Sequence, residues 1–328
     1  MGANNNALEY ISPRMTRRFT RLAWTAAAFT YLLIILGAIV RITGSGMGCG
    51  EHWPLCNGRL LPPLDLPTLI EYGHRLAAAA VSGLVAALAA YAWWLRRNAR
   101  SGMRDASNGP MALRRPPPPS GSLQRPGVAA YVALTLLVLQ VGLGAVTVKL
   151  SLPPWTVILH LGTAMLLLAT LIVAARGGRP TPGARLTPGA SRGSRGLSKS
   201  PGSRPGLVGA VALGLAFLTV LFGALTANTG AASACLGFPL CNGQIVPTGN
   251  YLQHIHWTHR LLAYALFGYV VWWAVRTTRR GAWYVVALVT LQVAVAAAMV
   301  LLALPRALQA AHVAVGAAVW AGLVLAAL

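Results

Sequence analysis

The chain has 328 residues, of which 56% are hydrophobic and only 10% are charged, yet its formal net charge is +22. A soluble protein of this size carries about 25% charged residues, so the composition excludes an ordinary soluble domain and indicates a membrane protein. The positive charge lies in the connections between apolar segments and forms no basic domain, so we do not expect nucleic acid as a partner.

Eight apolar segments follow one another along the chain. They lie near residues 22–42, 69–95, 128–148, 157–175, 207–227, 256–275, 283–304 and 307–328. Each is close to the roughly 20 residues that a helix needs to cross about 30 Å of hydrocarbon. Because backbone groups inside a bilayer have to be hydrogen-bonded within the segment, such segments form helices. The sequence therefore predicts an all-α polytopic membrane protein with eight transmembrane helices.

Basic residues lie on alternate connections, which sets the expected orientation. They cluster before the first segment, within residues 96–125, within residues 176–204, and after the sixth segment at Arg276, Arg279 and Arg280. This pattern predicts that both termini are cytoplasmic and that the protein resides in the plasma membrane. Residues 1–21 are expected to form a cytoplasmic tail. Residues 96–127 and 176–206, rich in Pro, Gly, Ser and Arg, are expected to be flexible cytoplasmic linkers.

The two halves of the chain repeat one another. "WPLCNGRLLP" at residues 53–62 matches "FPLCNGQIVP" at residues 238–247. The number of residues from Cys56 to His74 equals the number from Cys241 to His259. The number from Gln140 to His160 likewise equals the number from Gln292 to His312, and Pro153 and Pro305 occupy matched places. Chance similarity of Leu- and Ala-rich helices does not explain this spacing. We therefore expect two duplicated four-helix bundles, residues 22–175 and 207–328, in the same orientation.

Each half offers two histidines near the outer ends of two different helices. These are His74 and His160 in the first half and His259 and His312 in the second. Ionisable side chains inside a membrane are costly and are usually functional, and four-helix bundles can hold a haem between two axial imidazoles. The pairs are therefore predicted to be haem-iron ligands, whereas zinc would require a tight tetrahedral cluster. His52 and His254 fall outside the repeat and are expected to be loop residues near the haem edge.

Arginines and cysteines accompany the histidines. Arg75 and Arg260 follow the first histidine of each pair and could contact a haem propionate or extend to the membrane interface. Two cysteine pairs, Cys49–Cys56 and Cys235–Cys241, lie in outer loops that face an oxidising compartment and can form disulfides. A structural role and, for the first pair, a redox role both remain open. A metal site built from Cys49, His52 and Cys56 is a weaker alternative.

The halves differ at one informative position. Glu71 precedes His74 by three residues, where the second half has His256 before His259. Residues three apart lie on one helix face, so Glu71 is predicted to point toward whatever His74 binds. A carboxylate there can take a proton or stabilise positive charge on a ring. The alternative is that Glu71 forms a salt bridge with Arg75 or another cation at the interface.

The ordered motifs resemble the haem A synthase family, in the bacterial branch with disulfide-bearing outer loops. The resemblance rests on two four-helix repeats, a Cys pair in each outer loop, and four motifs: Glu71-x-x-His74-Arg75, His160-Leu161-Gly162, His259-Arg260 and His312. It covers most of the chain except the N-terminal tail and the two linkers, whose length departs from the family pattern.

The resemblance implies a reaction and a set of roles. Members oxidise the C8 methyl group of haem O to a formyl group, which gives haem A for terminal oxidases. By this resemblance His259 and His312 hold a permanent haem b, whereas His74 and His160 receive haem O. Glu71 matches the catalytic carboxylate, and Cys49–Cys56 matches a pair linked to substrate handling or electron flow. Haem O synthase and terminal oxidase assembly factors are the implied partners; the electron acceptor and the oligomeric state are not predicted.

Other functions remain open from the residues alone. The main rival is a diheme b-type cytochrome that transfers electrons without modifying haem, which explains the histidines but not Glu71. A membrane thiol oxidoreductase explains the cysteines but leaves the aligned histidines without a role. A haem transporter or chaperone is a third possibility.

Overall fold

A computed structural model describes residues 13–60, 62–107, 124–177, 206–278 and 280–328. These residues form eight α-helices and one short 3-10 helix, and the described parts contain no named strand. The elements are α1 (Pro13–Ile42), α2 (Leu66–Ser107), α3 (Gln124–Lys149), α4 (Pro154–Gly177), α5 (Leu207–Asn228), η3 (Ala231–Ser233), α6 (Tyr251–Thr277), α7 (Arg280–Leu301) and α8 (Arg306–Ala327). The prediction of an all-α protein is confirmed.

Seven of these helices are long and apolar enough to cross a membrane, within the described residues. They are all the α-helices except α6. α6 has 27 residues, but polar residues in its first half, including His256, His259 and Arg260, lower its hydropathy. The chain is therefore a multi-pass membrane protein, and the sixth predicted span, residues 256–275, lies in a helix that carries much of the polar site.

Several predicted boundaries were wrong. α1 begins at Pro13 rather than at residue 22, so residues 13–21 of the predicted tail are helical, and α6 begins at Tyr251 rather than at residue 256. α2 continues to Ser107, so the first part of the 96–127 segment is helical rather than a flexible linker. That part is rich in Arg and Ala, which favour helix, and has no proline before Pro110 to end it. α7 ends at Leu301 rather than at residue 304, because Ala303 and Leu304 adopt left-handed backbone conformations. The second predicted linker lies almost wholly outside the described residues.

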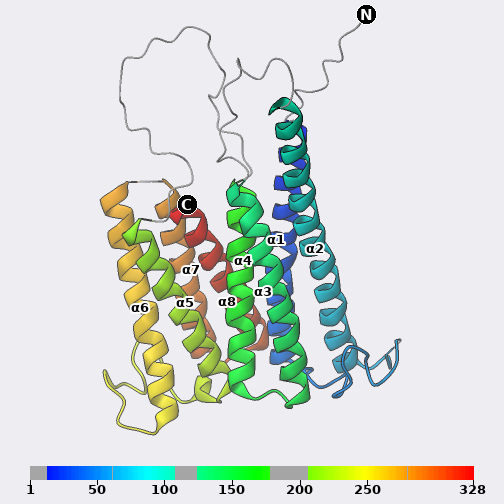
Figure 1. Ribbon diagram of the computed structural model, residues 1–328. Helices are drawn as coiled ribbons and strands as arrows, with labels where there is room; N and C mark the ends of the chain where they lie inside the picture. Colours follow the sequence, from blue (N-terminus) through cyan, green and yellow to red (C-terminus); the bar gives the residue numbers. More distant parts are fainter. Residues whose placement is uncertain (1–12, 61, 108–123, 178–205, 279) are drawn as a thin grey trace, which may run out of the picture.

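The helices pack as two closed groups of four (Figure 1). In the first group α1 contacts α2 and α4, and α3 contacts the same two helices. In the second group α5 contacts α6 and α8, and α7 contacts the same two. The groups meet through α4 and α5, α1 and α8, and α4 and α8. The loops that follow α1 and α5 lie at one end of the molecule, opposite the end where α8 finishes (Figure 1).

The contacts between the two groups involve residues at matched positions of the sequence repeat. On α1, Tyr31 donates a hydrogen bond from its hydroxyl to the Ala314 carbonyl on α8, at 2.9 Å. At the matched position on α5, Phe217 lies near Gly162 on α4. Trp320 of α8 is buried in the seam and donates from its indole nitrogen to the Met165 carbonyl on α4, at 2.8 Å. The core is therefore continuous across the two groups.

The turns between helices also correspond. Ser151 and Leu152, before α4, have positive φ angles of 57° and 63°. Ala303 and Leu304, before α8, have φ angles of 58° and 62°. In both turns the second of these residues donates its amide to a carbonyl five residues earlier. The two turns therefore have the same backbone conformation before the fourth helix of each group.

Candidate functional site

The four predicted ligand histidines lie in the second or third turn of α2, α4, α6 and α8. All four helices begin at the end of the molecule that carries the disulfide loops (Figure 1). α2 and α4 both contact α1 and α3, so they face each other across the first group. α6 and α8 face each other across the second group in the same way. Each pair of histidines therefore approaches the middle of one group from opposite sides, as axial ligands of a planar group would.

The second pair has a spacing suited to a metal between the rings. The ring centres of His259 and His312 are 6.5 Å apart, with ring planes inclined by 79°. Two metal–imidazole bonds of about 2 Å put the centres of the two rings roughly 6–7 Å apart. The spacing of His259 and His312 would thus allow both imidazoles to hold a haem iron in the second group.

Glycines bring three of the histidines close to neighbouring helices. A Cβ atom at Gly37 on α1 would lie 3.1 Å from Cε1 of His74, and one at Gly223 on α5 would lie 2.9 Å from Cε1 of His259. Gly144 on α3 is placed similarly against His160, at 3.2 Å. A larger residue at any of these positions would push the imidazole away from the helix. Sequence analysis missed these glycines, although Gly37 and Gly223 precede the first cysteine of their loops by equal distances.

The two first histidines differ in their hydrogen bonds. Nδ1 of His259 lies 3.1 Å from the Thr219 carbonyl on α5, which can accept its proton and leave Nε2 for a metal. Nδ1 of His74 is buried and has no hydrogen-bond partner among the described residues. A ring oriented by a carbonyl is the usual arrangement for a retained metal ligand.

The second histidine of each pair has a glutamine partner. Nε2 of Gln140 lies 3.1 Å from Nε2 of His160, and Nε2 of Gln292 lies 3.1 Å from Nδ1 of His312. The amide oxygens of both glutamines are buried without a partner among the described residues. Buried polar atoms of this kind call for a further group in a native structure. The sequence marked these glutamines as part of the repeat but did not predict their role.

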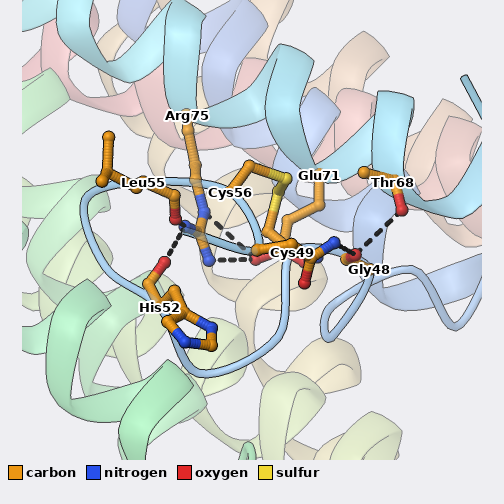
Figure 2. Close-up of polar contacts among 9 residues, drawn as sticks. Gly48, Cys49, His52, Leu55, Cys56, Thr68, Glu71 and Arg75 are labelled. Carbon is orange, nitrogen blue, oxygen red and sulfur yellow. Dashed lines mark hydrogen bonds and ion pairs between the residues drawn. A yellow bond between two sulfur atoms is a disulfide. The ribbon is translucent and has the colours of Figure 1, made fainter. Parts of the chain in front are cut away.

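Glu71 is buried beneath the first disulfide loop, and both of its carboxylate oxygens are engaged (Figure 2). Oε1 accepts two hydrogen bonds from Arg75, the shorter at 2.6 Å. Oε2 accepts the Cys49 backbone N–H at 2.7 Å. The salt bridge that the sequence left open is therefore present. Glu71 faces the disulfide loop that covers this end of the group, and it lies about one helical turn nearer to that loop than His74.

Arg75 and Arg260 attach the disulfide loops to their helices. Arg75 donates from Nη1 to the carbonyls of His52 and Leu55, at 2.8 and 2.7 Å (Figure 2). Arg260 donates to the Leu240 and Cys235 carbonyls, at 2.8 and 3.0 Å. Most of their donors are thus used within the protein, whereas the sequence offered a propionate or the membrane interface as the partner.

The cysteines form two disulfides, Cys49–Cys56 and Cys235–Cys241, which confirms the predicted pairing. No cluster of three or more metal-binding side chains occurs in the parts of the chain that the structure describes. A metal site built from Cys49, His52 and Cys56 is therefore wrong, because both sulfurs are used in the disulfide. His254 is exposed but lies in the first turn of α6, so its prediction as a loop residue was wrong.

His256 takes the place of Glu71 in the second group but makes a different contact. It is buried, and its Nδ1 lies 3.0 Å from the Ala231 carbonyl in η3. Arg260, four residues later, gives its donors to loop carbonyls instead of a carboxylate. Only the first group thus combines two histidines with a buried carboxylate.

Known proteins resemble most of this chain in sequence. The family model for cytochrome oxidase assembly protein (COX15-CtaA) matches residues 20–324. A haem A synthase of Symbiobacterium thermophilum is 32% identical over 84% of this chain and 83% of its own length. Haem A synthases of Shouchella clausii and Bacillus licheniformis are 31% and 28% identical, over 81% and 78% of this chain and 79% and 74% of their own lengths.

Proposed function

The chain belongs to the COX15-CtaA family of cytochrome oxidase assembly proteins, and from this premise we propose that it is a haem A synthase. It oxidises the C8 methyl group of haem O to a formyl group and so supplies haem A for terminal oxidases. The observation that carries the proposal is the asymmetry of two otherwise matched histidine pairs. Only the pair in the first group has a buried carboxylate, Glu71, one turn away.

The two groups of helices are proposed to be duplicated bundles with different occupants. His74 and His160 receive haem O in the bundle of residues 22–175, and His259 and His312 hold haem b in the bundle of residues 207–328. The matched turns, loops and helix contacts support the duplication. The Thr219 contact, present at His259, supports a retained haem in the second bundle, since it orients that ligand. His74 has no such partner in the described structure, which suits a substrate that has to enter and leave.

The chemistry at the first site has a defined balance. Converting a methyl group to a formyl group with oxygen from water releases four electrons and four protons. His74 and His160 together fill both axial positions of the substrate iron, so dioxygen would have to displace one of them. This favours loss of electrons and protons from the methyl group followed by addition of water. A haem between His259 and His312 supplies one-electron transfer chemistry, and the final acceptor is a separate redox partner.

Glu71 is proposed to move a proton in this reaction. Its Oε2 atom accepts one hydrogen bond, from Cys49, and a carboxylate oxygen has room for a second. The Arg75 contacts on Oε1 fix the direction in which Oε2 points. The Cys49–Cys56 loop therefore positions the carboxylate, and this structural role stands beside the redox role that its sequence allowed.

The orientation in the membrane is also a proposal. The ends of α1 and α2 away from the disulfide loops carry Arg17, Arg18, Arg96 and Arg97, which favours a cytoplasmic location for that end. The disulfide loops and histidines then lie toward the outer face of the plasma membrane. Haem O synthase and oxidase assembly factors are the proposed partners.

The test compares haem products in membranes supplied with haem O. Wild type, Glu71→Gln and His256→Gln are made in full, and their haems are extracted and separated by chromatography. Glu71→Gln keeps the shape and an acceptor for Cys49 but cannot take a proton, so haem A formation should fall by about a hundred-fold or more. His256→Gln is the matched control in the second bundle and should still give haem A.

Two results would contradict parts of the proposal. If wild type yields haem b alone despite the supply of haem O, the protein is a diheme electron-transfer cytochrome instead. If Glu71→Gln forms haem A as fast as wild type, the synthase function stands but Glu71 has only its structural role.

A further inference from the structure

The cations at the outer end of the helices differ in what their donors already bind. Arg75 donates to Glu71 and to loop carbonyls, and Arg260 donates to loop carbonyls. Arg59, Lys149 and Arg306 are exposed. Arg41, in the last turn of α1, is partly buried and makes a single hydrogen bond among the described residues.

Arg41 reaches across the seam between the two groups of helices. Its Nη1 atom donates to the Ala227 carbonyl in the last turn of α5, at 3.2 Å. An arginine has five N–H donors, so four remain for another acceptor. No carboxylate pairs with Arg41 in the part of the chain that the structure describes.

Helix geometry places Arg41 just outside both histidine sites. It lies four residues after Gly37, which touches His74, so it is about 6 Å further outward on nearly the same face of α1. Ala227 lies four residues after Gly223, which touches His259 on α5. The guanidinium thus spans from the wall of one site to the wall of the other.

The position suits a carboxylate carried by a haem. Ionised carboxylates are expelled from hydrocarbon, so the propionates of a haem held at this depth point toward the outer end. A guanidinium binds a carboxylate through a planar fork of two charge-assisted hydrogen bonds. We propose that Arg41 binds a haem propionate at the seam between the two groups, the role that sequence alone offered to Arg75 and Arg260. This inference rests on the proposed haem-binding function.

A simpler role competes with this one. A cation near the end of α5 also interacts favourably with the helix dipole and with an unpaired terminal carbonyl. That role needs no ligand, so it predicts a loss of stability that does not depend on the propionates. The test therefore compares two haems that differ only there.

The experiment uses the full chain in lipid nanodiscs after removal of haem. Iron protoporphyrin IX and its dimethyl ester are titrated separately, and binding is followed by the absorbance of the ligated haem. The variants are Arg41→Gln, Arg41→Lys and, as a matched control, Lys149→Gln at the exposed end of α3. Each titration is repeated with His160→Ala or His312→Ala to assign the effect to the first or the second site.

Arg41→Gln should weaken binding of the free acid by roughly ten- to a hundred-fold at one or both sites and leave diester binding within about twofold. Lys149→Gln should bind both haems as wild type does. Equal weakening of acid and diester, or no weakening of either, overturns the proposal. If Arg41→Gln binds neither haem, Arg41→Lys decides: a retained preference for the acid supports the proposal and its loss overturns it. The titrations measure haem binding and not haem A formation, so they test the role of Arg41 even if the protein has no synthase activity.

Discussion

Adding a single methyl group at Gly223 should weaken haem retention, and a control in the same helix should show whether general stability accounts for the loss. In Gly223→Ala the new Cβ would lie 2.9 Å from Cε1 of His259. Carbon atoms pack at about 3.5–4.0 Å, so the ring or the helix has to move by roughly 0.6–1.1 Å. The ring is also tied to the Thr219 carbonyl at 3.1 Å, so a movement of this size breaks or stretches that hydrogen bond.

The expected cost follows from two opposing contributions. Overpacking costs about 1–3 kcal/mol and the lost hydrogen bond about 1 kcal/mol. Replacing glycine by alanine inside a helix returns about 1 kcal/mol. The net effect on the haem site is about 1–3 kcal/mol, which corresponds to roughly five- to a hundred-fold weaker retention of haem b.

The assay measures haem b per protein after purification, together with the thermal midpoint of unfolding. Gly214→Ala is the matched control, since it lies in α5, is exposed and has no atom within 4 Å of a new Cβ. It should keep its haem and be as stable as wild type or slightly more so. Full haem retention in Gly223→Ala, or equal losses in both variants, would refute the idea that Gly223 sets the position of His259.

Two further predictions concern the first group. In Gly144→Ala the new Cβ would lie 3.2 Å from His160, so binding of haem O, measured in a His312→Ala background, should weaken several-fold. The control is Ala296→Gly at the matched position of α7, which should leave haem b retention unchanged. Asp65 accepts the Thr68 backbone amide at 3.1 Å, and hydrogen bonding from the side chain and backbone of Thr68 lowers the pKa of its carboxyl. Its capping of α2 should therefore be complete above about pH 4 and be lost as the pH falls through the lowered pKa. Asp65→Asn, which copies the cap of α6 by Asn250, should remove that pH dependence of amide-exchange protection at Thr68, and an unchanged dependence would contradict the assignment.

The sequence repeat predicted the fold and the histidine pairs because it depends on spacing, which folding preserves. Equal steps along the chain place equivalent residues at equivalent turns of equivalent helices. The loop contacts bear this out, since the Leu55 carbonyl accepts from Arg75 as the Leu240 carbonyl does from Arg260. Helix ends were less predictable, because the extension of α2 beyond the apolar segment depends on helix propensity in water rather than on hydropathy.

The partner of Glu71 could not be predicted from spacing alone. On a helix, residues three and four apart are both neighbours, so Glu71 could face the site of His74 or pair with Arg75. The outcome depends on the loop, whose Cys49 amide comes within 2.7 Å only after the chain has folded back over α2. The close approach of Gly37, Gly144 and Gly223 to imidazole rings was missed for a similar reason, since it depends on helix packing.

Four differences between the two groups lie at or near the first site. Relative to the second group it has a carboxylate at Glu71, a cation at Arg41 where α5 has Ala227, and a glycine at Gly144 where α7 has Ala296. It also lacks, in the described structure, the carbonyl contact that orients His259. In both groups an arginine still donates to loop carbonyls and a disulfide still closes the loop, although Arg75 also binds Glu71. On the proposed function, a retained haem needs a fixed ligand and a dry, neutral pocket, whereas a substrate needs charges to recognise it and a ligand free to turn. On this proposal the two bundles share one arrangement of helices, turns and loops, and the side chains that differ at the sites decide whether a haem is retained or modified.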